Sequence, residues 1–387
     1  MDAKELMEII SLGETSQVQF KRMLDHQDKI AAEMIAMSNG KGGTIIFGVD
    51  DKTGDVIGLE YSDLQFIGNK LPTIASDLIK PQANFLTEVV TIGTKKLLLT
   101  HVEEGVAKPY KDNNGAIWVK KGADKRRLTD NNEQMRLFQH SGLLHMDEMI
   151  VPDTGTEDID QAKVSHYLKQ MLQKTEDEEI ALNEVLYQNL GIVKKGNMTL
   201  GGLLFFSKHP QKYRPIFCAK AVAFYGNSIG GLHYRDSRDI IGTIPEMFKE
   251  GMLFFKQNLK HAQKGQNFNS VGILEISEIA LEELLQNALI HRDFTMSAPV
   301  RLLIFDDRLE ISSPGCLPNS LTVEKIKLGM AVARNSLLAS YASKLLKYRG
   351  LGSGIVRAIK EQPNIEFIND ESGNQFIVKI PREEPMP

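Results

Sequence analysis

The segment 278–290, which reads EIALEELLQNALI, constrains the fold of this chain more than any other. Its apolar residues recur at helical spacing and predict a helix with one buried face. That face comprises Leu281, Leu284, Leu285 and Ala288. Glu283 and Asn287 are four positions apart and therefore lie on one face, one turn from each other. An Asn in this position can hold a metal ion while the Glu orients or deprotonates a water molecule. The alternative is an ordinary solvated face of an amphipathic helix.

Strand-like and turn-like stretches follow this helix. Residues 300–305 read as a strand and residues 312–318 as a tight turn. Further on, the sequence RGLGSG at 349–354 precedes a helix predicted over 355–361. Glycines just before a helix allow backbone N–H groups to face a phosphate, which the helix dipole also favours. The same glycines could instead serve only as a cap or a turn.

In this order, the segments resemble the GHKL ATPase-like domain at the C-terminus of bacterial proteins often labelled RecG-related or divergent AAA. The resemblance covers residues 275–382 and implies a Bergerat-type α/β sandwich that binds ATP and Mg²⁺. In GHKL enzymes the Glu of E-x-x-x-N activates water and the Asn holds magnesium. The resemblance therefore implies a catalytic role for Glu283 and Mg²⁺ binding by Asn287. The cofactor-binding residues that it implies are Asn287, Arg334, Asn335, Gly350, Gly352 and Gly354.

The sequence departs from the GHKL pattern at one place. GHKL proteins usually carry an Asp in a D-x-G-x-G turn that reads the adenine amine, whereas residues 312–315 here read SSPG. The preference for ATP over another nucleotide thus rests on the resemblance, and hydrolysis is left open beside binding alone. A helicase motor is not expected. The Gly-Lys pair at 40–41 lacks both the Ser/Thr and the upstream glycine of a P-loop.

The N-terminal part of the chain carries a second set of motifs. Residues 27–38 predict a helix that ends in the glycine-rich loop 39–43, and residues 44–49 (TIIFGV) read as a buried strand. Further strands are predicted at 89–92, 97–102 and 117–120. With Gly13-Glu14 and the sequence QFK at 19–21, these segments resemble the Schlafen/AlbA-type domain over residues 12–140. Its family members bind DNA or RNA, so the resemblance implies an α+β nucleic-acid-binding domain, with DNA ahead of RNA.

Basic and aromatic residues alternate late in this region. Residues 108–127 hold seven basic side chains against two acids, and Tyr110 and Trp118 lie among them. Cations that meet phosphates and aromatic rings that stack on bases suit a nucleic-acid surface. The predicted contacts are Lys108, Lys111, Trp118, Lys120, Lys121, Arg126 and Arg127. The alternative is a solvated hairpin with Trp118 in the core.

Some Schlafen proteins are RNases that use three carboxylates, and this chain matches that pattern incompletely. Glu14 and Asp50 occupy two of the positions, but the second Glu is replaced by Gln19. An amide oxygen can coordinate a metal, yet an amide cannot act as a base. We therefore expect at most a degenerate metal site at Glu14 and Asp50, and intrinsic nuclease activity is kept only as an alternative. Asp50 could equally be an ordinary turn residue.

Length and composition frame these two regions. A chain of 387 residues exceeds one ordinary core, so two or three domains are expected. Acidic sequence at 151–180 and a polar loop at 264–270 mark the boundaries. We predict an α+β multidomain protein with a Schlafen/AlbA-type domain at 1–150, a middle α/β connector at 151–270 and a GHKL-like domain at 271–387. A strand is predicted at 203–206 within the connector.

The charge and cysteine content exclude several classes of protein. The formal net charge is -4, so a nucleic-acid surface must be a local patch. Cys218 and Cys316 form neither a disulfide framework nor a zinc-ligand spacing, which indicates the cytoplasm. The first ten residues carry acids and no long apolar run, so no secretory leader is expected. No stretch approaches the roughly 20 apolar residues of a membrane span, and no membrane partner is expected.

Together these features predict a nucleotide-regulated nucleic-acid-binding protein. A transcription regulator and an anti-phage defence component are both compatible with them. Two alternatives stay open, namely a metal-dependent nuclease of the Schlafen type and an oligomeric scaffold with a degenerate nucleotide site. Because GHKL domains commonly dimerise, the resemblance also implies a homo-oligomer.

Overall fold

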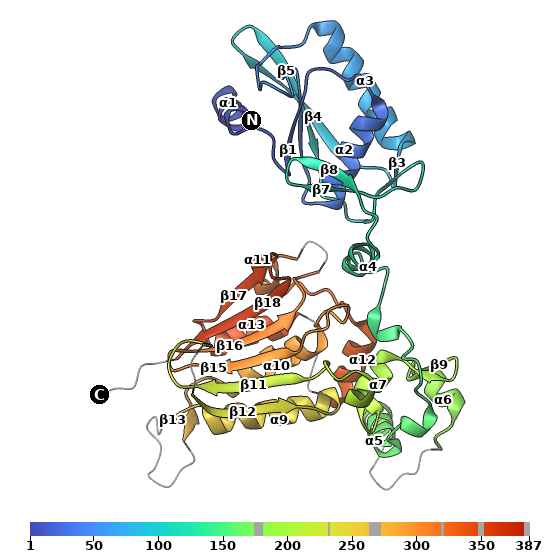
Figure 1. The fold of residues 1–387 in the computed structure, drawn as a ribbon, viewed down its shortest axis with the longest axis vertical. Coiled ribbons are helices and arrows are strands. Elements are labelled where there is room, and N and C mark those ends of the chain that lie inside the picture. The colour runs from blue at the N-terminus through green and yellow to red at the C-terminus, as the bar shows by residue number, and fades with distance from the viewer. Residues whose placement is uncertain (174–180, 231–232, 263–271, 319–320, 347–351, 383–387) are drawn as a thin grey trace. The chain divides into compact units, whose positions relative to one another are not determined.

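The computed structural model describes residues 1–173, 181–230, 233–262, 272–318, 321–346 and 352–382. The chain divides into two compact units, Met1–Leu143 and Leu144–Pro387, and each is described by itself (Figure 1). Among the described residues, no helix is both long enough and apolar enough to cross a membrane.

The first unit is built on a mixed four-stranded sheet with the order β1-β2-β5-β4. Its strands are β1 (Val18–Lys21), β2 (Gly43–Phe47), β4 (Phe85–Ile92) and β5 (Lys95–Val102). Strand β1 is parallel to β2, and the other pairs are antiparallel. Helices α2 (Gln27–Asn39) and α3 (Tyr61–Asp77) pack on one face, and α1 (Ala3–Leu12) packs on the other (Figure 1).

This layering explains the continuous apolar run of β2. Ile45 and Phe47 pack with residues of α2 and α3, whereas Ile46 packs with Leu6 of α1. Successive side chains of a strand point to opposite faces, so a strand covered on both sides is apolar at every position. The remaining elements are β3 (Ile79–Lys80), β6 (Lys111–Asp112), the hairpin of β7 (Trp118–Lys121) and β8 (Asp124–Arg127), and α4 (Asn131–His140).

The second unit contains a six-stranded sheet with the order β12-β11-β15-β16-β18-β17. Its strands are β11 (Ala219–Phe224), β12 (Tyr234–Ile240), β15 (Val300–Ile304), β16 (Arg308–Pro314), β17 (Glu366–Asp370) and β18 (Gln375–Pro381). Strands β11 and β15 are parallel, and the other neighbours are antiparallel. Helices α9 (Ile244–Asn258), α10 (Glu278–Ile290) and α13 (Ser353–Glu361) lie against one face (Figure 1).

A group of helices packs beside this sheet and shares its core. The group comprises α5 (Gln161–Leu172), α6 (Glu184–Asn189), α7 (Leu200–Phe206), α8 (Pro210–Tyr213) and α12 (Ser336–Leu345). Tyr341 of α12 contacts the rings of Tyr167, Phe205 and Phe206 at centroid distances of 5.5, 5.4 and 4.8 Å. The short elements of the unit are β9 (Val193–Lys194), β10 (Asn197–Met198), β13 (His261–Ala262), β14 (Ile273–Leu274), α11 (Val323–Lys327) and the 3-10 turns η1 (Met146–Glu148) and η2 (Thr156–Asp158).

Near the start of this unit, Asp147 is fully buried and fixes α12. Its Oδ2 accepts hydrogen bonds from the N–H groups of Leu337 (2.7 Å) and Leu338 (3.0 Å). Burial raises the pKa of this carboxyl above its ordinary value. Asp147 thus joins the first residues of the unit to the N-terminal turn of a helix near the end of the chain.

The predicted boundary between a connector and a C-terminal domain at residue 270 does not separate compact units. Strands β11 and β12 precede residue 270, yet they extend the sheet formed by β15, β16, β17 and β18. Helix α12 follows residue 270, yet it packs on α5 and α7. The residues before and after position 270 therefore belong to one compact unit, because their apolar side chains share a single core.

Two local predictions differ from the structure. The strand predicted at 203–206 is part of helix α7, because Thr199 caps its start by accepting from the Gly202 N–H (2.9 Å). A short apolar run cannot be assigned to helix or strand by periodicity alone. The turn predicted at 312–318 begins later, since Ser313 and Pro314 still pair with β18 and the chain turns only at Gly315, whose φ is +97°.

Candidate functional site

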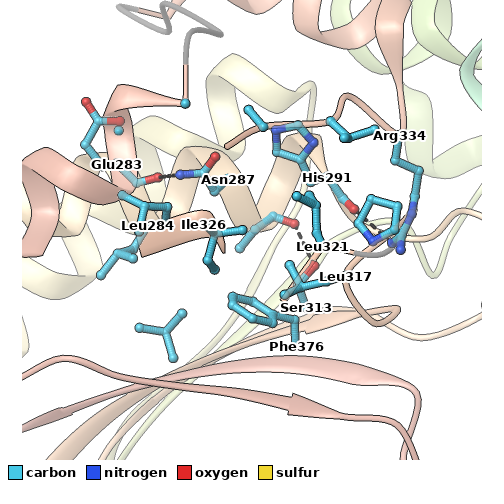
Figure 2. Close-up of a pocket in the computed structure, with 18 of the residues that line it drawn as sticks. Glu283, Leu284, Asn287, His291, Ser313, Leu317, Leu321, Ile326, Arg334 and Phe376 are labelled. Carbon is cyan, nitrogen blue, oxygen red and sulfur yellow. Dashed lines mark hydrogen bonds between the residues drawn. The ribbon is translucent and has the colours of Figure 1, made fainter. Parts of the chain in front are cut away.

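A pocket lies in the second unit between α10, strands β16 and β18 and the start of α13 (Figure 2). Ile311, Phe376 and Val378 give the sheet side an apolar surface, and Glu283 and Asn287 of α10 line the opposite wall. Further described lining residues lie within 315–318, 321–334 and 352–357. In Figure 2, Glu283 and Arg334 lie at opposite ends of the pocket. Such an arrangement offers an apolar region for a flat ring and a polar region for charged groups.

The spacing within α10 aims both predicted residues at the pocket. Leu281 and Leu285 are fully buried in the core, so Glu283 and Asn287 fall on the side that faces the pocket. Glu283 is buried. Its Oε1 accepts a hydrogen bond from Nη2 of Arg357, which lies on α13 and also lines the pocket. The predicted catalytic carboxylate is therefore paired with a guanidinium group.

Asn287 presents an oxygen that suits a hard cation. Its Nδ2 donates to the backbone oxygen of Glu283 (2.7 Å), and among the described residues no group donates to its Oδ1. The described residues contain no cluster of three or more His, Cys, Asp or Glu side chains that could hold a metal alone. Mg²⁺ is often held by few protein ligands together with substrate phosphates and water. The donor set therefore fits Mg²⁺ carried in with a nucleotide, with Asn287 as its protein ligand.

Gly352 caps the start of α13 and Gly354 lies in its first turn, and both are closely packed. Gly352 has a φ of +73°, and a Cβ there would collide with the backbone oxygen of Gly329. A Cβ on Gly354 would collide with the carboxylate of Glu283. Both glycines line the pocket, so the start of α13 lies directly against the predicted catalytic residue. Gly350 lies outside the described residues.

Arg334 and Asn335 have structural contacts that their predicted cofactor-binding role does not include. Arg334 lines the pocket, but its guanidinium donates to the backbone oxygens of His291 (3.1 Å) and Cys316, and the residue is 3% exposed. Asn335 does not line the pocket. Its Nδ2 donates to the backbone oxygens of Ile290 (2.8 Å) and Arg292 (2.9 Å), which closes the C-terminal end of α10.

Three further pocket residues were not identified from the sequence. Burial, assisted by the charge of Arg334, lowers the pKa of His291 to about 4, so this side chain is neutral at pH 7. Ser313 occupies the pocket at the end of β16 and donates to the backbone oxygen of Ala288 (2.9 Å). Arg357 could have been found from its position, since it lies three residues after Gly354 in the helix that the glycines open.

In the first unit, the predicted basic surface is largely occupied by internal contacts. Nζ of Lys120 bonds to Gln19 Oε1 (2.7 Å), Glu33 Oε2 (3.1 Å) and the backbone oxygen of Ala123 (2.6 Å). The side chains of Lys120 and Glu33 are 5% and 3% exposed. Lys125 binds the other oxygen of Glu33 at 2.6 Å. Lys120 therefore does not fit its predicted role, because a buried ammonium group cannot meet a phosphate on the surface.

Two other predicted contacts are also held by neighbouring groups. Lys108 donates to Glu104 (2.7 Å) and to the backbone oxygen of Gly40 (2.8 Å). Arg126 forms two hydrogen bonds with Glu133, at 2.8 and 2.6 Å. These pairs reduce the charge that either cation can offer to a phosphate.

The hairpin still presents a smaller surface. Lys121 and Arg127 are exposed, and the Arg127 guanidinium lies 5.1 Å from the ring centre of Trp118. The indole Nε1 of Trp118 donates to Asp112 (2.9 Å), which fixes the ring. Lys111 is half-buried, with its Nζ 5.7 Å from the ring of Phe138. The candidate nucleic-acid surface therefore comprises Lys121, Arg127 and Trp118, whose ring is only partly exposed because it also packs against the core of the first unit.

The two carboxylates of the predicted degenerate metal site each accept hydrogen bonds from other groups. Glu14 Oε1 accepts hydrogen bonds from Gln19 Nε2 and from the Phe20 N–H. Asp50 accepts instead from the N–H groups of Lys52 and Thr53 (3.0 Å each), which lowers its pKa and makes it a turn residue. Because Lys120 supplies a cation to Gln19, a divalent ion near that amide would meet an ammonium group.

Three family models match the chain. Residues 14–129 match the model described as "Schlafen, AlbA_2", and residues 297–380 match "Putative ATP-dependent DNA helicase recG C-terminal". Residues 135–218 match a domain of unknown function. The predicted pairing of a Schlafen/AlbA-type domain with a C-terminal ATPase-like domain is confirmed, and it points to a nucleic-acid-associated protein. Glu283 and Asn287 precede the C-terminal match, so their roles rest on the pocket geometry.

Two solved structures are similar to the chain. The crystal structure of the DIP2311 protein from Corynebacterium diphtheriae is 20% identical, covers 99% of this chain and 80% of that chain, and has a TM-score of 0.48. The solution structure of the N-terminal domain of a "Putative ATP-dependent DNA Helicase RecG-related Protein" from Nitrosomonas europaea is 21% identical, covers 34% of this chain and 96% of that chain, and has a TM-score of 0.26. A comparison with curated proteins gave no match.

Proposed function

We propose that this protein is a nucleotide-regulated nucleic-acid-binding protein. Its second unit binds ATP with Mg²⁺, and the hairpin β7–β8 of its first unit binds nucleic acid. One observation carries the proposal, namely the pocket in which Glu283 and Asn287 of α10 face the glycine-bounded start of α13. A transcription regulator and an anti-phage defence component would both work in this way.

The lining of the pocket supports a nucleotide as its ligand. The base would lie over Ile311, Phe376 and Val378, where apolar contact and ring stacking are available. The phosphates would lie toward Glu283, Asn287 and the N-terminal turn of α13, whose unpaired N–H groups and dipole favour an anion. Asn287 would hold Mg²⁺ through Oδ1.

Hydrolysis would depend on Glu283. A carboxylate can take the proton from an attacking water only when one of its oxygens is within hydrogen-bond reach of that water. Glu283 lines the pocket, so its carboxylate lies on the side where such a water would bind. Its Oε1 accepts a hydrogen bond from Arg357 and would have to be released first. Binding without turnover is therefore the minimal form of the proposal, and turnover is its extended form.

Calorimetry with ATP and Mg²⁺ tests the minimal form, and phosphate release tests the extended form. We expect the wild type to bind ATP, Asn287→Ala to bind it weakly, and Glu283→Ala to bind it without turnover. Lys360→Ala, an exposed change on α13, is the matched control and should behave as the wild type. If the folded wild type bound no nucleotide, the proposal would be refuted and the second unit would be a scaffold.

The nucleic-acid half of the proposal rests on Lys121, Arg127 and Trp118, which combine two exposed cations with a fixed aromatic ring. Phosphate contacts would come from the cations and base stacking from the indole. Duplex DNA is the first ligand to test, with single-stranded DNA and RNA of matched length beside it. Light scattering with and without ATP would test whether the nucleotide changes a homo-oligomeric state.

A further inference from the structure

The ion pair between Arg357 and Glu283 is the starting point, because it lies inside the pocket and joins its two walls. Glu283 is on α10 and Arg357 is in α13, and Nη2 of the arginine donates to Oε1 of the carboxylate. The two side chains differ in exposure, at 36% for Arg357 and 11% for Glu283. The Arg357 guanidinium is therefore more accessible to a ligand in the pocket than the Glu283 carboxylate is.

Arg357 is also the cation best placed to meet an anion. The described lining contains three side chains that could carry positive charge, namely His291, Arg334 and Arg357. His291 is neutral at pH 7, and Arg334 is 3% exposed with its guanidinium bound to two backbone oxygens. Only Arg357, among these described residues, is both substantially exposed and charged.

We infer that Arg357 is the residue that recognises the terminal phosphate of a nucleoside triphosphate, and that it releases Glu283 when it does so. The inference rests on the proposed function, because it deepens the nucleotide site. An arginine fork matches a phosphate as well as it matches a carboxylate, so one partner can replace the other. The pair thus holds Glu283 away from water until a ligand with the right phosphate chain arrives.

The packing around the ion pair places Glu283, Arg357 and the first turn of α13 next to one another. The Cα of Gly354 lies against the carboxylate of Glu283, three residues before Arg357 in the same helix. Phosphates near the first turn of α13 would therefore meet Arg357 one turn further on. A ligand without phosphates would fill the apolar region and leave the ion pair intact.

An alternative role for Arg357 is a simple tether of α13 to α10. A tether would affect every ligand of the pocket alike, because its loss would loosen one wall. Recognition of the terminal phosphate would instead affect ATP strongly and adenosine little. The dependence of affinity on the phosphate chain therefore separates the two roles.

The experiment measures the affinity of ATP, ADP and adenosine by calorimetry on the full chain with Mg²⁺. Arg357→Ala should weaken ATP binding by at least about tenfold, the effect expected for one charge-assisted hydrogen bond, and leave adenosine binding unchanged. Arg357→Lys should recover part of the loss, because a cation remains. Lys360→Ala is the control on the exposed side of α13.

Glu283→Gln tests the exchange itself. This change removes the competing charge, so ATP should bind more tightly than to the wild type, by about three- to tenfold. The gain should vanish when Arg357→Ala is present in the same chain, because the guanidinium that it frees is then absent. Thermal unfolding of each variant shows whether its pocket is intact.

The outcomes separate this inference from the proposed function. A wild type that binds no ATP refutes the proposed function, and the inference with it. A wild type that binds ATP, with Arg357→Ala and Arg357→Lys equal to it, refutes the inference and leaves the proposed function standing. A loss of equal size for ATP and adenosine assigns Arg357 to the tether and refutes the inference too. If Arg357→Ala does not fold, Arg357→Lys and Glu283→Gln give the same comparison.

Discussion

Replacing Lys120 tests whether the basic hairpin is an internal support or a binding surface. The structure predicts that Lys120→Met destabilises the first unit, because the change leaves Glu33 with one cation instead of two. Removing one partner of a buried ion pair costs about 3–5 kcal/mol. Lys125 keeps its contact with Glu33, so we expect the lower end, about 3 kcal/mol. For a unit of 143 residues this corresponds to a fall of roughly 10 °C in Tm.

The chain provides its own probe and its own control for this measurement. Trp118 is the only tryptophan, and it lies in β7 beside Lys120, so its fluorescence reports unfolding of the first unit. Lys121→Met changes the adjacent, exposed lysine and should alter stability by no more than about 0.5 kcal/mol. In urea the midpoint of Lys120→Met should fall by about 1–2 M, while that of Lys121→Met stays in place.

The same two variants should differ in their affinity for nucleic acid. Lys121→Met should weaken binding, whereas Lys120→Met should bind normally under conditions in which it is folded. If Lys120→Met were as stable as Lys121→Met, the internal network around Glu33 would be refuted. Lys120 would then again be a candidate phosphate contact, as the sequence predicts.

Three further predictions concern the surface, the pocket and its support. Changing Lys121 and Arg127 together to Ala should lower the slope of log affinity against log salt by about 2, and an unchanged slope would remove the hairpin from the DNA-binding surface. The pKa of His291 is about 4 in the folded chain, below its unfolded value, so the unfolded chain binds the extra proton. Stability of the second unit should thus be complete above about pH 6.5 and fall by up to roughly 3 kcal/mol toward pH 4, and calorimetry should show a flatter profile for His291→Gln. Asn335→Ala should destabilise the second unit by about 2 kcal/mol through two lost buried hydrogen bonds, and a change in ATP affinity without that loss would restore its predicted role as a ligand.

Features set by local spacing could be predicted from the sequence. The shared face of Glu283 and Asn287 follows from their separation of one helical turn, and the structure places both in one pocket. The doubly buried strand β2 follows from its continuous apolar run. In both cases the residues that decide the outcome are neighbours in sequence.

Features that depend on distant partners could not be predicted. The basic run from 108 to 127 suggests a charged surface, but the carboxylate that binds Lys120 is 87 residues away in sequence. Arg334 and Asn335 stand at the start of a helix, a position typical of ligand-binding residues, yet their partners are backbone oxygens more than 15 residues distant in sequence. Charge and spacing alone do not show whether a side chain turns inward.

The buried Asp147 joins the helix that follows a pocket-lining loop to the first residues of the second unit. Only three residues separate it from Leu143, where the first unit ends. Its two hydrogen bonds cross 190 and 191 positions of sequence to the first turn of α12. The loop just before that turn, through Ala331, Val332 and Arg334, lines the pocket. A ligand that shifts this loop would therefore also act on the first turn of α12, which Asp147 holds through both hydrogen bonds.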